Sequence, residues 1–510
     1  MIPLLGALWV AAATAAAADK PPITPHAEVK KVQDATLFDL ELDGPVLGVV
    51  ILRKTDQGHR VLALVGPPEK ERGAEPCGVA AAAAPEPRRG ARLFAWELEH
   101  PETLVAVGRD IPEGTIGAVD LDGDGADEAV LFGDAGIDEL VVDLAGRVTT
   151  VRPLVAGRFA PVLDASLLGF ALKDRADPAL RAVSIGSLTT YRREGTDVVR
   201  PTSDVELPIQ VYRRSDGFHV RSSTVRPIGR PADGRMRLAS GGDSIPDLRR
   251  VRVLLLDPEG PPDSRVVEAW ARFPSRERAL ERRVALLDGS PVLIVLTTPA
   301  DKLSLFGEKL LRVFPLAADR TRAGNAPLLA QETGINLWQI ASSDLLDLDG
   351  DGRDDLVLSY WKGLKDAIAA FEVRPRAPDG SFGRARSFDF DVPEGDRASM
   401  FYGKDLDGDG RPDLALRAGG EFLVYPGSPP DRALDRPVAK VPSRRIPLSE
   451  DLRLATAQSV SFGPGGLSVE SIVTDFRLPR FVDLDGDGRI EAIFAGGVAP
   501  AGRILIVRFR

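Results

Sequence analysis

The sequence predicts an all-β protein that folds as a single closed β-propeller, and three observations lead to this fold class. An acidic hexapeptide recurs four times along the 510 residues. Apolar runs that are too short for helices surround each copy, which is the pattern of buried β-strands. The spacing of the copies divides the chain into units of about 70 residues, which is enough for a four-stranded propeller blade.

The first eighteen residues carry no charged side chain and end in a run of alanines. A short apolar segment followed by small residues is typical of a secretory signal peptide. We therefore expect residues 1–18 to be a signal peptide that is cleaved between Ala16 and Asp19. An uncleaved anchor is the alternative, and the run is short for a spanning helix of about 20 apolar residues. The mature protein, residues 19–510, is expected to be secreted, periplasmic or at the cell surface, without a transmembrane segment.

Composition limits the classes of function. The chain has 65 basic and 75 acidic residues and a net charge of -10, the wrong sign for a surface that attracts nucleic-acid phosphates. Its single cysteine, Cys77, excludes an intramolecular disulfide and a cysteine-rich zinc module. We therefore expect no nucleic-acid partner, a monomer, and a fold held together by its core and by bound metal ions.

The hexapeptide Asp-Leu-Asp-Gly-Asp-Gly begins at Asp120, Asp347, Asp405 and Asp483. The apolar runs 129–132, 356–358, 414–416 and 492–494 follow the four copies. Each acidic loop is therefore predicted to connect one strand to the next.

The spacing of the loops predicts the number of blades. The gap between the first and second copies is about three times as long as the interval between the third and fourth. We interpret this gap as three intervals, with two further units whose acidic loop has been lost. Together with one unit before residue 110 this predicts seven blades, with six and eight as alternatives. The chain ends at Arg510, too soon after Gly488 for a whole blade, so an N-terminal strand is expected to complete the last blade and to remove an open sheet edge.

Two segments depart from the repeat. Residues 67–90 contain several prolines and an alanine run, and we expect a disordered loop insertion there. Residues 264–283 have apolar positions that fit a short helix, which Pro274 would break.

The residue types and spacing within each loop point to a metal site. With the first aspartate as position 1, carboxylates fall at positions 1, 3, 5 and 9, and glycines at 4 and 6 permit a tight turn. The carbonyl of position 7 would supply a further oxygen. Four converging carboxylates repel one another without a cation, and flexible cages of oxygen ligands favour Ca²⁺ over Mg²⁺.

About four calcium sites are therefore predicted. Their expected ligands are Asp120, Asp122, Asp124, Ala126 and Glu128; Asp347, Asp349, Asp351, Arg353 and Asp355; Asp405, Asp407, Asp409, Arg411 and Asp413; and Asp483, Asp485, Asp487, Arg489 and Glu491. An EF-hand is excluded, because position 12 holds Leu131, Leu358, Leu416 or Phe494 in place of its bidentate glutamate. Solvated Asp-Gly turns without metal are the remaining alternative.

These loops and their flanking strands resemble the FG-GAP/VCBS repeats of integrin-α-like β-propellers. The resemblance covers the four loops and their flanks, and Glu128 and Glu491 stand where the repeat has aspartate at position 9. It implies an FG-GAP/VCBS-type propeller over residues 19–510 that binds calcium on one face of the ring. The family serves in ligand binding, adhesion and scaffolding, and as an appendage to enzymes, so the resemblance predicts fold and metal better than role.

Two functions remain open. The chain has four histidines and contains no HExxH, GxSxG or Walker motif, so we expect no catalytic residues. The first hypothesis is an exported calcium-binding propeller that binds or scaffolds an extracellular or envelope protein or glycan, with calcium in a structural role. The alternative is a polysaccharide-active lyase or hydrolase built on a calcium propeller. We expect partner contacts on the irregular segments 67–90 and 374–386 rather than in the acidic loops.

Overall fold

The computed structural model is an all-β structure, and the α-helix among its described residues, α1 (Pro430–Ala433), has only four residues. Within this described part no helix is long and apolar enough to cross a membrane. The structure describes residues 25–32, 35–53, 59–66, 90–98, 100–112, 114–122, 124, 126–132, 136–142, 148–156, 180–184, 187–194, 198–206, 209–214, 217–222, 225–229, 237–240, 250–256, 266–272, 277–299, 309–316, 327–333, 341–362, 368–390, 399–418, 420–448, 456–463, 466–473, 480–482, 490–496 and 502–509.

The strands pair in chain order into antiparallel sheets, most of them four-stranded. The sheets of the first half are β3 (Val46–Arg53), β4 (His59–Val65), β5 (Ala91–Glu97) and β6 (His100–Ile111); β7 (Thr115–Val119), β8 (Glu128–Phe132), β9 (Gly136–Val142) and β10 (Val148–Ala156); β11 (Leu180–Ser184), β12 (Ser187–Glu194) and β13 (Val198–Glu206); and the hairpin of β14 (Ile209–Arg214) and β15 (Gly217–Ser222).

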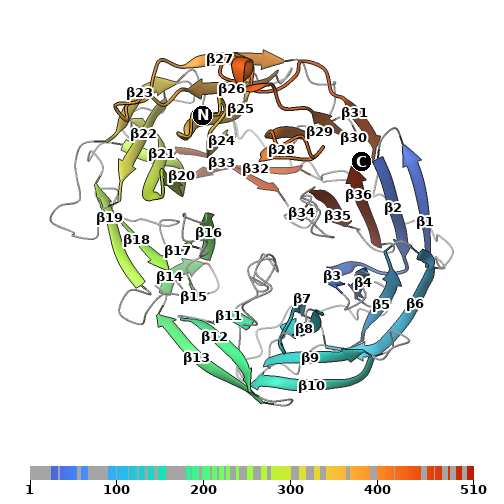
Figure 1. The fold of residues 1–510 in the computed structure, drawn as a ribbon. Helices are drawn as coiled ribbons and strands as arrows, with labels where there is room; N and C mark the ends of the chain where they lie inside the picture. The colour runs from blue at the N-terminus through green and yellow to red at the C-terminus, as the bar shows by residue number, and fades with distance from the viewer. Residues whose placement is uncertain are drawn as a thin grey trace, which may run out of the picture.

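The second half continues this pattern. Its sheets are β16 (Val225–Gly229), β17 (Arg237–Ser240), β18 (Arg250–Leu256) and β19 (Val266–Arg272); β20 (Glu277–Leu287), β21 (Ser290–Pro299), β22 (Lys309–Pro315) and β23 (Leu329–Thr333); β24 (Ala341–Leu346), β25 (Asp355–Lys362), β26 (Ile368–Arg374) and β27 (Arg386–Phe390); β28 (Ser399–Lys404), β29 (Asp413–Ala418), β30 (Glu421–Tyr425) and β31 (Arg444–Pro447); and the hairpin of β32 (Thr456–Gly463) and β33 (Gly466–Val473). Figure 1 shows these sheets around a common centre, with the first strand of a sheet, such as β3, β7 or β24, on its inner side and the last strand, such as β6, β10 or β27, on its outer side.

The two ends of the chain share one sheet. This five-stranded sheet runs in the order β1 (His26–Val32), β2 (Ala35–Leu42), β36 (Gly502–Phe509), β35 (Glu491–Gly496) and β34 (Arg480–Val482). Strand β2 pairs with β36 along its whole length, from Ala35 opposite Phe509 to Leu42 opposite Gly502. The prediction that an N-terminal strand completes the last sheet is confirmed.

A short turn shows how local sequence sets the register. Asp288 and Gly289 both have positive φ angles, 48° and 76°, and form the two-residue loop that places Leu287 opposite Ser290. Two consecutive residues with positive φ are the requirement of a type I′ turn, whose twist matches that of a hairpin. The Asp-Gly pair that follows the apolar end of β20 therefore joins β20 to β21.

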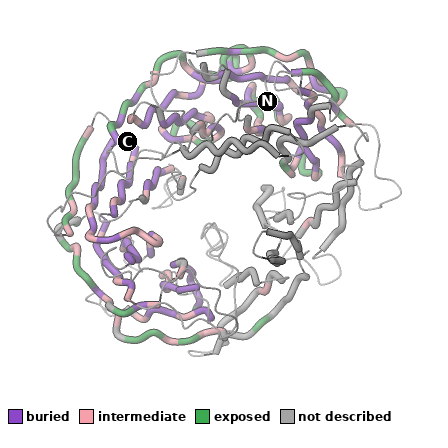
Figure 2. Tube along the Cα trace, turned by 180° about the vertical axis from the view of Figure 1, so that it is seen from behind, coloured by how far each residue is buried: buried purple, intermediate pink, exposed green. Residues whose placement is uncertain are grey.

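The core lies between neighbouring sheets. Buried residues of β24–β27 form one cluster with those of β20–β23 and another with those of β28–β31. At the sheet shared by the two termini, the ring of Phe422 packs edge-on against Phe494, with 4.9 Å between centroids. Figure 2 shows the resulting gradient, with buried residues inside the sheets and exposed residues along outer strands such as β1. The sheets β24–β27 and β28–β31 thus each contribute both faces to the core.

Three sheets of three or more described strands lie between the first and second acidic loops, where the spacing predicts two units. If the stretch from Asp120 to Asp347 is divided into four equal parts, each part is close in length to the interval from Asp347 to Asp405. The longer interval between the third and fourth loops contains the extra hairpin β32–β33.

Other sequence predictions have different outcomes. The helix expected within 264–283 is wrong, because β19 and β20 occupy most of this stretch, and Val266 and Val267 suit a strand. The predicted signal peptide, 1–18, lies outside the described residues. So does the predicted insertion at 67–90, except for its last residue, Gly90.

Candidate metal centres

The acidic loops connect adjacent strands, as predicted. The first joins β7 to β8, the second β24 to β25, and the third β28 to β29, and the two strands in each case pair as a hairpin. Strands β34 and β35 flank the fourth loop in the same way. Of that loop, Asp483, Asp485, Asp487 and Arg489 lie outside the described residues. Glu491 opens β35, is buried, and accepts a 3.1 Å hydrogen bond from Arg508 Nε to its Oε1.

The position 1 aspartate organises the turn in the second and third loops. Oδ1 of Asp347 accepts hydrogen bonds from the backbone N–H of Gly350 at 2.8 Å and of Asp351 at 3.1 Å, and Oδ2 accepts from Gly352 at 2.8 Å. The corresponding distances from Asp405 are 2.7, 3.1 and 2.9 Å. Because two loops on different sheets reach the same geometry, the hexapeptide itself specifies the turn.

The glycines at positions 4 and 6 have the backbone conformation that the turn requires. Their φ angles are 76° and 82° in the second loop and 80° and 82° in the third. These values lie in the left-handed region, which a Cβ atom makes costly. Glycine at both positions is thus a conformational requirement.

The carboxylates converge in each described loop. One oxygen each from Asp120, Asp122 and Glu128 lie within 4.8 Å of one another. The same holds for the trio Asp347, Asp349 and Asp351, and for the trio Asp405, Asp407 and Asp413. The structure therefore brings together three of the predicted acidic side chains per loop.

The position 5 aspartates are held partly by position 7. Asp351 Oδ1 accepts the backbone N–H of Arg353 at 2.9 Å, and its Oδ2 is paired with the Arg353 guanidinium. Asp409 and Arg411 repeat this arrangement, with an N–H to Oδ1 distance of 2.9 Å. In the first loop Ala126 donates its N–H to Asp124 at 2.7 Å but has no side-chain charge to offer. The amino acids at position 7 thus contact position 5, and their role as carbonyl ligands stays a prediction.

The position 9 carboxylates have a structural role that the sequence analysis missed. Asp413 Oδ2 accepts the N–H of Leu406 at 2.7 Å, and its Oδ1 accepts the N–H of Gly427, after β30, at 2.7 Å. Asp355 likewise accepts the N–H of Leu348 at 3.1 Å and of Arg376, after β26, at 2.8 Å. In the first loop Glu128 accepts the N–H of Leu121 at 2.6 Å. Position 9 thus ties the loop to its own sheet.

Electrostatics favour a cation at these loops. Burial, together with the charges of the neighbouring aspartates at positions 3 and 5, raises the pKa of Asp355 to about 6 and that of Asp413 to about 7, although backbone N–H groups bound to each carboxylate act in the opposite direction. Burial and the charges of Asp409 and Asp405 also raise the pKa of Asp407. A divalent cation among these oxygens would reverse the repulsion. The donor set, three or more oxygens on a flexible loop, fits a hard cation of the calcium type.

The second loop also contacts the neighbouring sheet. The N–H of Asp288, in the β20–β21 turn, donates to Asp354 Oδ2 at 3.2 Å, and Arg376 Nη2 lies 3.5 Å from Asp288 Oδ2. Position 8 is Pro412 in the third loop, which offers no such acceptor. Sequence reasoning could not find this contact, because its partners are 66 residues apart.

No family model and no curated protein matches the chain. Among solved structures, the crystal structure of a protein from Lactobacillus plantarum is 13% identical, with a TM-score of 0.33, over 77% of this chain and 97% of that one.

Proposed function

We propose that the chain is an exported, calcium-stabilised β-propeller of the FG-GAP/VCBS type that acts as a binding or scaffolding module. The observation that carries this proposal is the repeated loop geometry: two loops, each with three carboxylates within 4.8 Å, share the same hydrogen bonds. A tight turn that orients several carboxylates toward one point is suited to bind a cation. The loops join strands of the core sheets, so calcium would act on stability.

The ring is proposed to be closed and to have eight blades. The described residues form eight sheets of three or more strands, and one of these is the sheet that the two chain ends share. Eight was an alternative in the sequence analysis, and the pairing of β2 with β36 supports closure because it brings strands from the two ends of the chain into one sheet. Closure would remove the exposed edges of an open sheet array.

We propose binding rather than catalysis because carboxylates of the acidic loops already accept hydrogen bonds from the backbone. Position 1 and position 9 carboxylates each accept two or three backbone N–H groups in the second and third loops. Carboxylates used in this way are poorly placed to act as general acid and base on a substrate. The partner, an extracellular or envelope protein or a glycan, would then be bound by loops that the rigid sheets carry.

Calcium titration of the full mature chain tests this proposal. We expect calorimetry to show about four sites, and excess EGTA to lower the melting temperature. A site whose free calcium is 100 times its Kd stabilises the native state by about 2.7 kcal/mol. An unchanged melting curve in EGTA, together with no metal detected by mass spectrometry, would contradict the proposal. Cleavage of a polysaccharide by the purified protein would favour the enzyme instead.

A further inference from the structure

A small cavity lies beside the hairpin extension that follows β26. It has a volume of about 270 Å³ and is lined by Pro375, Arg376, Ala377, Gly383, Arg384, Ala385 and Arg386. Ligand pockets that enclose drug-sized molecules span about 300 to 1,000 Å³. The cavity is therefore of a size for one residue of a polymer rather than for a free cofactor.

Contacts within the hairpin itself hold the wall of the cavity in place. The hairpin is closed by hydrogen bonds from Gly383 N to Pro375 O at 2.7 Å and from Ala377 N to Ser381 O at 2.8 Å. Its inner side is anchored to the core by Phe382, which is buried and stacks under the guanidinium of Arg376 at 4.6 Å. A preformed site loses little conformational entropy when a ligand binds.

The two exposed arginines of the lining are available to an anion. Arg384 is exposed and forms no hydrogen bond or ion pair with any residue in the described part of the chain. Arg386 is paired at 2.8 Å with Asp435, whose side chain is 74% exposed. An exposed pair of this kind contributes about 0–1 kcal/mol, so an incoming carboxylate can replace Asp435.

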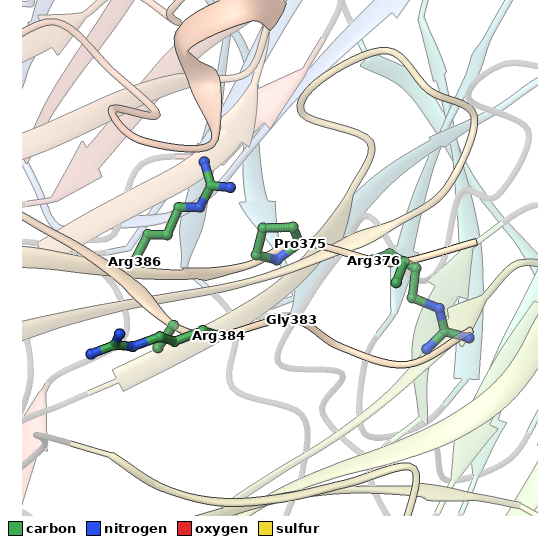
Figure 3. A pocket seen from close by; sticks show the side chains of 7 residues that line it. Pro375, Arg376, Gly383, Arg384 and Arg386 are labelled. Atoms are coloured by element: carbon green, nitrogen blue, oxygen red, sulfur yellow. The ribbon is translucent and has the colours of Figure 1, made fainter. Parts of the chain in front are cut away.

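The remaining arginines of this segment, Arg374 and Arg376, have largely buried side chains, and each lies beside a carboxylate. Arg374 is buried and hydrogen-bonded to Glu372, and Arg376 Nη2 lies near Asp288. Figure 3 shows that the guanidinium of Arg376 points to the opposite side of Pro375 from those of Arg384 and Arg386. Arg386 is the first residue of β27 and Arg384 lies in the non-strand segment just before it, so both side chains leave the chain on the same side of Pro375. The available positive charge is therefore concentrated on one side of the cavity.

The chemistry of the wall selects the kind of anion. Pro375, Ala377 and Ala385 are apolar, and the N–H groups of Ala377 and Gly383 are already donated within the hairpin. No side-chain hydroxyl or amide and no aromatic ring is among the lining residues. The hydroxyl groups of a sugar could accept from the arginines, but no lining side chain would accept the protons that the hydroxyls donate, so part of their hydrogen bonding to water would be lost. A side chain with methylene groups and a terminal carboxylate matches both the apolar wall and the arginines.

We propose that this cavity binds a glutamate or aspartate side chain of a partner protein, with its carboxylate on Arg384 and Arg386. The inference rests on the proposed binding function and specifies the partner as an acidic peptide segment. It also explains how a chain with a net charge of -10 can attract an acidic partner, through a local reversal of charge.

The test uses the full mature chain in excess calcium and a short labelled peptide of alternating glutamate and alanine, followed by fluorescence anisotropy. We expect saturable binding that weakens with salt, at least tenfold weaker for the double variant Arg384→Ala, Arg386→Ala. The matched control is Arg445→Ala, because Arg445 also forms an exposed ion pair, with Glu421 at 3.2 Å, away from the cavity. The control is expected to bind within twofold of the unchanged chain.

Two further probes make the inference falsifiable. The same peptide with glutamine for each glutamate should not bind, and an oligogalacturonate of equal charge should bind at least tenfold more weakly than the glutamate peptide. Stronger binding of the oligogalacturonate, or equal binding of the double variant and the unchanged chain, would overturn the inference. Melting curves of each variant with and without EGTA report separately on the proposed function, since calcium-dependent melting can persist when peptide binding is absent.

Discussion

Arg503 binds the carboxylate of Asp39 across the join between the two ends of the chain. Its Nε donates to Asp39 Oδ1 at 2.8 Å and its Nη2 to Oδ2 at 2.6 Å, although the two residues are 464 positions apart. Lys30 Nζ of β1 adds a third contact, at 3.3 Å to Oδ2. The three side chains thus connect β1, β2 and β36 on one face of the shared sheet.

Removing Arg503 should destabilise the whole fold. The Asp39 side chain is only 10% exposed, so Arg503→Ala leaves a largely buried carboxylate with only Lys30 as a cationic partner. We expect a loss of about 2–4 kcal/mol in the free energy of unfolding, measured by urea denaturation. Arg445→Ala, which breaks an exposed pair, should cost about 1 kcal/mol or less. Equal effects of the two substitutions would contradict a structural role for the pair.

The same pair predicts a pH dependence. Burial alone would raise the pKa of Asp39, but the hydrogen bonds and charges of Arg503 and Lys30 outweigh burial and lower it. A carboxyl whose folded pKa is lowered stabilises the fold above its unfolded pKa of about 4, and this contribution is lost as the pH falls through the folded value. The stability difference between the unchanged chain and Asp39→Asn should therefore be constant from pH 7 to 5 and shrink below about pH 4. A difference that grows on acidification would refute the assignment.

Each acidic loop should bind calcium independently. Asp349→Ala removes one carboxylate of the trio in the second loop, whereas the third loop keeps its own trio. Because each set of ligands is local, we expect calorimetry to show one weakened site and the others unchanged. Asp431→Ala, at an exposed aspartate of α1, should leave all sites intact. Loss of every site on Asp349→Ala would mean that the loops do not fold separately.

Two glycines should respond differently to the same substitution. A Cβ at Gly410 would contact nothing within 4 Å, so Gly410→Ala costs only the strain of a φ of 82°, about 1–2 kcal/mol. A Cβ at Gly502 would lie 2.2 Å from the carbonyl oxygen of Gly44 and 2.8 Å from Val46 Cγ2. Gly502→Ala must therefore displace the backbone next to the shared sheet. Melting temperatures should fall more for Gly502→Ala, and the reverse order would contradict this packing.

Local interactions explain which features the sequence could predict. Asp347 binds N–H groups three to five positions ahead, so the hexapeptide contains its own turn and strand boundaries. The role of Asp413 could not be predicted in the same way, because its partner Gly427 is 14 residues away and its place depends on how β29 and β30 pair.

The spacing of the loops was a weaker guide than the loops themselves. It assumes equal units, and neither the hairpin β32–β33 nor the third sheet between the first two acidic loops carries a hexapeptide that would reveal it. The basic cavity at 375–386 was anticipated only as an irregular segment rich in Pro, Gly and Arg. Which arginines of the segment 374–386 are free depends on partners such as Glu372, for Arg374, and Asp288, for Arg376, and Asp288 lies on another sheet.

The position 9 carboxylate of the third loop should stabilise the fold even when no calcium is bound. Asp413 is fully buried, and its two oxygens accept N–H groups from Leu406 and Gly427. Asp413→Asn replaces one acceptor by an NH₂ group that faces a donor, so we expect a loss of about 1–3 kcal/mol even in EGTA. Asp407→Asn, at a half-buried position 3, should lose stability mainly in calcium. Urea denaturation of both variants with and without calcium checks this, and an Asp413→Asn variant that loses no stability in EGTA would show that Asp413 is no more than a metal ligand.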